Sequence, residues 1–218
     1  MSYNPFQAVE EFEKALAEYC GAPYCCLIDS CTNAFFLTLK FYGIKNKDIV
    51  FPRKTYLSMP MMALATDNRV IFDDYEWKGI YPITILGRQD LLLIDSAKRL
   101  HKNDYVPNSV MFKSFHMKKH ITSVSGKGGA ILTDNKDLYE WCLKARWEGR
   151  TPYTDYKAQE QDITIVGFNM NPTPEQAVFL HRQLQKCPDY MPDLEEPGGY
   201  RNLDEFTVFK NCKIMPRC

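Results

Sequence analysis

One stretch decides how this chain folds: from residue 110 to residue 132 it reads VMFKSFHMKKHITSVSGKGGAIL. Both ends are apolar runs typical of buried strands, and a glycine-rich turn from Gly126 to Gly129 leads into the second run. A lysine held between two strands, beside a turn that needs glycine, can act as a Schiff-base nucleophile. The alternative is that Lys118 and Lys119 form a solvated pair in a loop, as most surface lysines do.

The composition is that of a globular protein with one domain. The chain has 218 residues, of which 45% are hydrophobic and 25% charged, enough for one buried core with a small appendage. The 27 basic residues balance the 27 acidic ones, and no basic stripe interleaved with aromatic residues is present. This argues against nucleic acid and anionic membranes as partners. Without a signal peptide or a long apolar segment, the chain is expected to be cytoplasmic.

The eight cysteines do not follow the pattern of a metal site or a disulfide framework. No C-x-x-C pair occurs, and the four histidines lie at no ligand spacing from a cysteine. Most cysteines have apolar neighbours, as Cys25 and Cys26 do. We therefore expect reduced thiols that pack as small hydrophobic side chains, and no metal.

The apolar periodicity predicts strands that alternate with helices. Helices are expected over residues 6–20, 32–42, 56–66, 138–147 and 173–184, and a polar loop over 151–162. Strands are expected at 24–28, 48–51, 70–73, 81–86, 91–95, 108–115 and 129–133, with a last short one at 206–209; those at 70–73, 81–86 and 91–95 read as buried on both faces. This alternation predicts an α/β fold with a mixed, mostly parallel sheet and helices on both faces.

Three further segments carry residues that suit a ligand site. Residues 30–34 (SCTNA) open a helix after a strand, where backbone N–H groups can bind an anion, although Ser30 and Thr32 would serve equally as helix caps. Asp95 ends an apolar strand, where open α/β sheets bind ligands, although aspartate also forms turns. Residues 167–171 (GFNMN) precede the last predicted helix.

Taken in order, and with residues 11–13 (EFE) and 19–21 (YCG) upstream, these segments resemble the DegT/DnrJ/EryC1/StrS family of sugar aminotransferases. The family hallmarks are a Ser-Gly-Thr helix start, a Glu-Asp-Ala-Ala strand end, Ser-Phe-(His or Tyr)-x-x-Lys-Asn, a Gly-Glu-Gly-Gly turn and Gly-x-Asn-x-Arg. The resemblance runs from about Glu11 to Leu184. It implies a pyridoxal-phosphate enzyme whose large domain covers residues 1–187, with a short C-terminal extension at 188–218 in place of most of the small domain.

The resemblance also implies a role for each matching residue. Lys119, and not Lys118, would form the Schiff base with pyridoxal 5'-phosphate and then move the proton of the reaction. Asp95 would pair with the pyridinium nitrogen of the cofactor. The remaining matches would contact the cofactor: Ser114 and the N–H groups of Cys31 and Thr32 at the phosphate, Tyr56 over the ring, and Asn169 at the phosphate of a neighbouring subunit. A homodimer with shared active sites is therefore expected.

Several positions depart from the family pattern. Lys98 stands where glutamine or histidine is common, Ile94 replaces a glutamate, Asn171 replaces an arginine, and the glycine turn is longer, with Lys127 in place of glutamate. The segments that hold the substrate are shortened.

The expected reaction is transfer of an amino group from glutamate to a keto sugar linked to a nucleotide. Two alternatives remain. One is a catalytically degenerate homologue that serves as a binding or assembly partner. The other is a sugar dehydratase, in which histidine would replace the lysine; Lys119 argues against this, although His120 follows it.

Overall fold

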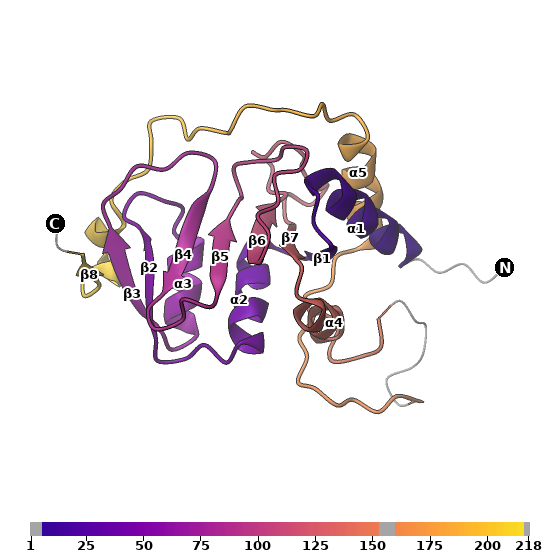
Figure 1. The fold of residues 1–218 in the computed structure, drawn as a ribbon, viewed down its shortest axis with the longest axis horizontal. Coiled ribbons are helices and arrows are strands. Elements are labelled where there is room, and N and C mark those ends of the chain that lie inside the picture. Colours follow the sequence, from indigo (N-terminus) through magenta and orange to yellow (C-terminus); the bar gives the residue numbers. More distant parts are fainter. Residues whose placement is uncertain (1–5, 153–159, 216–218) are drawn as a thin grey trace.

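The computed structural model describes residues 6–152 and 160–215, and within them it has the predicted α/β fold (Figure 1). The sheet of these described residues has eight strands in the order β1-β7-β6-β5-β4-β2-β3-β8. The strands are β1 (Tyr24–Ile28), β2 (Asp48–Pro52), β3 (Arg69–Asp73), β4 (Tyr81–Ile85), β5 (Leu92–Asp95), β6 (Ser109–Ser114), β7 (Gly129–Thr133) and β8 (Lys213–Ile214). The helices are α1 (Gln7–Cys20), α2 (Cys31–Phe41), α3 (Ser58–Ala65), α4 (Lys136–Ala145) and α5 (Pro174–Leu184), with short 3-10 turns η2 (Leu203–Glu205) and η3 (Thr207–Phe209).

The strand directions create one edge at which ligand-binding loops meet. Strands β1, β6, β5, β2, β3 and β8 run one way, while β7 and β4 pair antiparallel with their neighbours. The carboxyl ends of β1, β2, β5 and β6 therefore lie on the edge where β4 and β7 begin. Open α/β sheets bind their ligands at this kind of edge.

Helices cover both faces of the sheet, each over its own hydrophobic cluster. Helices α2, α3 and α4 pack on one face, where Phe35 makes edge contacts with Phe51 and Phe112. Helices α1 and α5 pack together on the other face, with Phe12 against Phe115. Figure 1 shows α1 and α5 over the β1–β7 end of the sheet, with the chain after α5 running along the upper edge to β8. None of the helices in the described residues has the length and apolar character needed to cross a membrane.

Local signals place the helix ends close to their predicted positions. Helix α1 ends at Gly21, which has a left-handed φ of 76°. Helix α4 begins two residues before the prediction because the Asn135 side chain caps it, accepting a hydrogen bond from the N–H of Leu138 at 3.0 Å. Helix α5 has a reciprocal capping box between Thr173 and Gln176.

One predicted strand is absent, and another is present but not buried as predicted. The strand at 81–86 is not buried on both faces: in β4 every second side chain is exposed, including Pro82 and Thr84, as an antiparallel strand allows. The strand at 206–209 is absent, because its apolar run belongs to turn η3, where Phe209 packs edge-on against Phe72 at 5.6 Å. Most of the predicted loop at 151–162 falls on residues 153–159, outside the described residues.

The cysteines lie largely where packing places small apolar side chains. Four are fully buried, namely Cys20, Cys25, Cys26 and Cys142. Cys31, Cys187 and Cys212 are partly exposed, and all seven have free thiols. Cys218 lies outside the described residues.

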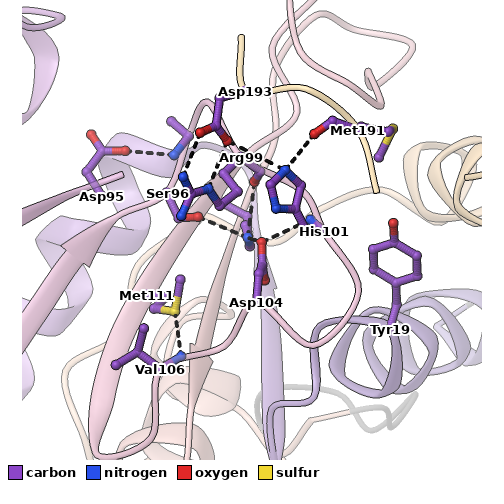
Figure 2. A network of polar contacts seen from close by, with 12 residues as sticks. Tyr19, Asp95, Ser96, Arg99, His101, Asp104, Val106, Met111, Met191 and Asp193 are labelled. Carbon is purple, nitrogen blue, oxygen red and sulfur yellow. Dashed lines mark hydrogen bonds and ion pairs between the residues drawn. The ribbon is translucent and has the colours of Figure 1, made fainter. Parts of the chain in front are cut away.

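Strand β6 carries a buried lysine next to the site. The Lys113 side chain is 2% exposed, and its Nζ lies 2.6 Å from Oδ2 of Asp104, whose side chain is 5% exposed. The same ammonium donates to Ser96 Oγ at 2.9 Å and to the carbonyl of Arg99 at 3.1 Å. Figure 2 shows Ser96, Arg99 and Asp104 gathered at this point. One ammonium thus holds three points of the loop between β5 and β6.

We expect Lys113→Met to lower the free energy of unfolding by about 3–5 kcal/mol, because it leaves the Asp104 carboxylate buried without its cation. Urea denaturation followed by circular dichroism measures the change. The control is Lys136→Met, which removes an exposed pair with Glu140 (3.1 Å) and should change stability by less than about 0.5 kcal/mol. Equal effects of the two substitutions would contradict this account.

Candidate active site

A cavity of about 610 Å³ opens at the carboxyl edge of the sheet. Six of the seven predicted site residues line it: Cys31, Thr32, Tyr56, Asp95, Ser114 and Lys119. They come from the ends of β1, β2, β5 and β6, which the strand directions bring to one edge. Segments separated by up to 88 positions in the chain, from Cys31 to Lys119, therefore share one pocket.

One wall of the cavity is the beginning of helix α2. Ser30 acts as the predicted cap, since its Oγ accepts a hydrogen bond from the N–H of Asn33 at 3.1 Å. This leaves the N–H groups of Cys31 and Thr32, which have no acceptor inside the helix, at the positive end of its dipole. Gly129 lies so close that a Cβ there would collide with the backbone of Ser30 and Cys31. Glycine at this position is therefore what lets β7 approach the turn.

Asp95 places a buried carboxylate on the cavity floor. Its Oδ2 accepts a hydrogen bond from the hydroxyl of Tyr81 at 2.7 Å, and its Oδ1 accepts one from the N–H of Ala97 at 2.8 Å. Burial raises the pKa of Asp95 above its usual value, although the hydrogen bond from Tyr81 and the charge of Lys119 act in the opposite direction.

Tyr81 is a residue of the site that the sequence analysis missed. It stands directly opposite Asp95 in the antiparallel β4–β5 pair, and its ring is fully buried. Burial raises the pKa of its hydroxyl, which therefore stays protonated and remains a hydrogen-bond donor. A tyrosine at the start of a strand gives no signal of this role until the pairing is known.

Both lysines of the decisive stretch border the cavity, but they differ in exposure. Lys119 is partly buried and Lys118 is exposed. A turn fixes the segment, because the N–H of Lys119 donates to the carbonyl of His116 at 2.9 Å. The charge of Lys119 acts on three groups at the cavity: it partly offsets the rise that burial causes in the pKa of Asp95 and of the Cys31 thiol, and it helps to lower the pKa of Lys98.

Two predicted residues stand apart from the others. Asn169 does not line the cavity; its side-chain amide donates to Glu148 Oε1 at 3.2 Å. Tyr56 borders the cavity, but its side chain is 60% exposed.

The segment after helix α5 forms a wall of the cavity that the sequence analysis did not foresee. Leu194, Pro197 and Tyr200 are among the residues lining it. The Tyr200 ring lies 4.5 Å from Nζ of Lys98 and stacks on Trp77, with 6.1 Å between ring centroids. The sequence analysis had noted Lys98 as a departure from the family pattern, but it did not predict that this segment would lie next to it.

Across residues 6–152 and 160–215, no three His, Cys, Asp or Glu side chains gather closely enough to hold a metal ion. The groups that line the cavity are instead a buried carboxylate, primary amines and a helix N-terminus. Such a set can bind an anion, hold a proton on a basic nitrogen and offer an amine to a carbonyl group.

Comparison with known proteins finds distant relatives. The chain is 23% identical to the UDP-4-amino-4,6-dideoxy-N-acetyl-beta-L-altrosamine transaminase of Campylobacter jejuni, an alignment that covers 94% of this chain and 64% of the relative. It is 26% identical to the GDP-perosamine synthase of Caulobacter vibrioides, covering 88% of this chain and 60% of the relative. The chain thus spans less than two thirds of the length of these relatives.

The fold also matches solved structures. A DegT DnrJ EryC1 StrS aminotransferase from Brucella abortus superposes with a TM-score of 0.71 at 15% identity, covering 96% of this chain and 80% of that one. The model of the DegT/DnrJ/EryC1/StrS aminotransferase family matches residues 3–82 and 108–196, which is most of the sequence. These findings confirm the predicted family and fold. The chain therefore belongs to the DegT/DnrJ/EryC1/StrS aminotransferase family.

Proposed function

We propose that this chain is a pyridoxal-phosphate-dependent aminotransferase that moves an amino group from glutamate to a nucleotide-linked keto sugar. One observation carries the proposal: Asp95, Lys119 and the start of helix α2 face the same cavity. Family membership and the names of the relatives, a transaminase and a perosamine synthase, support the reaction class.

The residues of the cavity fit the cofactor. Asp95 is a buried carboxylate whose pKa is raised by burial, as expected for a group that awaits a cationic partner. It would hold a proton on the pyridine nitrogen. The N–H groups of Cys31 and Thr32, with the hydroxyl of Ser114, would bind the phosphate. When bound, pyridoxal phosphate supplies an electron sink for the bond electrons released at the substrate carbon.

The chain itself would supply the proton transfer. The Nζ amine of Lys119 would attach the cofactor through a Schiff base in the resting protein, and it would serve afterwards as the base that moves a proton at the substrate carbon. Tyr81 would keep the Asp95 carboxylate oriented through its hydrogen bond.

We further propose that residues 1–187 form the cofactor-binding domain and that residues 188–218 are an extension, of which Leu194, Pro197 and Tyr200 border the cavity. Asn169 would act on the cavity of a second subunit in a homodimer, because in its own subunit the side chain bonds to Glu148 outside the cavity.

A second candidate is a homologue without catalysis that binds a partner. The departures from the family pattern at Lys98 and Asn171 favour this candidate. The two candidates differ in whether the cofactor and the amino donor react, and this can be measured directly.

We expect protein that has been incubated with pyridoxal phosphate and freed of unbound cofactor by gel filtration to be yellow, and the Lys119→Ala variant to lose the Schiff-base absorbance, because that bond requires the Nζ amine. The matched control is Lys118→Ala, which should stay yellow. Absorption spectra between 300 and 500 nm measure the difference, and addition of glutamate should bleach the wild type. A colourless wild-type protein would rule out the aminotransferase.

We expect Asp95→Asn to stabilise the cofactor-free protein at neutral pH, because it removes a charge that burial disfavours. In the folded protein the pKa of Asp95 lies above its ordinary value of 3.8. The wild type therefore gains stability as the pH falls from neutral toward 3.8, because the folded state binds the proton first. The stability advantage of the variant shrinks over the same range. Unfolding curves between pH 4 and pH 8 measure this. Asp90→Asn is the control, and its effect on stability at neutral pH should have the opposite sign. The hydrogen bond from Arg88 lowers the pKa of Asp90, so the ionised carboxylate stabilises the folded protein. An advantage that grows at low pH would contradict the prediction.

We expect the Lys119→Ala and Asn169→Ala variants to be poor binders of the cofactor when separate and to complement each other when mixed. Subunit exchange gives a heterodimer in which one site combines an intact Lys119 with the partner's intact Asn169. Recovery of yellow colour after mixing, together with a dimer mass by light scattering, checks this. If Asn169→Ala alone binds cofactor as tightly as wild type, the shared site is excluded.

A further inference from the structure

Residues 188–200, which we call the C-terminal strap, are firmly held up to Leu194. The N–H of Leu194 donates to the carbonyl of Lys98 at 2.9 Å, and the N–H of Lys102 donates to the carbonyl of Asp189 at the same distance. Arg99 binds the Asp193 carboxylate with two hydrogen bonds of 2.8 and 2.6 Å. Figure 2 shows Arg99 reaching Asp193 and His101 reaching Met191. The first part of the strap therefore has a fixed position.

Beyond Leu194 the strap is held over the cavity mainly by its side chains. Glu196 Oε2 lies 3.3 Å from Nζ of Lys98, and the Tyr200 ring lies 4.5 Å from the same atom. Between these two residues, Gly198 and Gly199 have φ values of +79° and +72°, with no atom within 4 Å of where a Cβ would stand. The strap bends here in open space, so Glu196 can move without unpacking a core.

Lys98 is the cation over which the strap closes. Its side chain is only 7% exposed and borders the cavity that holds Asp95 and Lys119. Burial lowers the pKa of its ammonium, while the carboxylate of Glu196 opposes the shift. A cation so placed needs an anionic partner, and in the described residues that partner is the carboxylate of Glu196, 34% exposed.

We propose that Lys98 is the residue that binds a substrate carboxylate, and that Glu196 occupies this position in the free chain until the ligand displaces it. The ligand class is a carboxylic acid of low molecular mass. Naming glutamate as that acid rests on the proposed function; the exchange of carboxylates on Lys98 does not.

The charge balance of the exchange is even. The ligand carboxylate replaces the Glu196 carboxylate on one ammonium, and Glu196 returns to water, to which it is already partly exposed. The ligand must compete with a tethered group, so free wild-type protein binds it more weakly than a chain without the Glu196 charge. Glu196 therefore competes with the ligand for Lys98 within the same molecule. Trp77 stacks on Tyr200, so its fluorescence reports movement of the strap.

The test is the binding of glutarate, a dicarboxylate without an amine, to the cofactor-free protein. Calorimetry gives the affinity, and tryptophan fluorescence follows the strap. Glu196→Gln should tighten binding about fivefold, the value of one partly exposed ion pair. Glu195→Gln is the matched control: it removes the same charge from the next residue, which lies 4.0 Å from Lys78, and should stay within about twofold of wild type. Lys98→Gln should abolish binding.

Equal tightening in Glu196→Gln and Glu195→Gln would overturn the proposal, because it would indicate a general charge effect. So would undetectable binding to Glu196→Gln, or wild-type affinity in a Lys98→Gln variant with a native circular dichroism spectrum. The cofactor spectra of the same preparations separate the two proposals. A protein that stays colourless yet shows this pattern retains the carboxylate site and excludes the aminotransferase. A yellow protein that does not show this pattern retains the cofactor site and excludes the exchange of carboxylates on Lys98.

Discussion

The buried ion pair between Lys113 and Asp104 is the interaction on which the site depends. It joins the middle of strand β6 to the loop between β5 and β6, where the same ammonium also binds Ser96 and the carbonyl of Arg99. Breaking this pair would leave an uncompensated buried charge, so the pair favours the position of the loop in which these contacts form. From that position it presents Lys98 to the cavity on one side and Arg99 to the C-terminal strap on the other.

The directions of the strands bring the other residues of the site together. Asp95 and Ser114 reach one cavity because β5 and β6 are parallel neighbours, and Tyr81 reaches Asp95 because β4 runs the other way and begins at that edge. The helix start at Cys31 joins them only because Gly129 has no Cβ. A substitution at this glycine would therefore change the cavity without altering any polar group in it.

The sequence predicts the groups whose signal is local. A serine cap before a helix, an aspartate at a strand end and a lysine before a glycine turn are each visible within a few residues, and together they indicated the family. Contacts between distant segments, such as Glu196 with Lys98, leave no periodic trace. The sequence analysis also missed Lys113, because a lysine is seldom fully buried even when it follows a run of apolar residues. The strand predicted at 206–209 is wrong because these apolar residues belong to a turn, from which Phe209 packs into the core.

The strap raises the question of why a charged pair closes the cavity where an apolar contact would serve. The chain just beyond the strap is fixed independently of Glu196, since Arg53 binds Asp204 with hydrogen bonds of 2.6 and 2.8 Å and Leu203 is buried. Closure as such therefore needs nothing from Glu196. A pair whose carboxylate is 34% exposed adds little to stability, because water screens part of the attraction. What it does provide is a carboxylate that can be exchanged for another one, and this property, not stability, accounts best for the charges at this point.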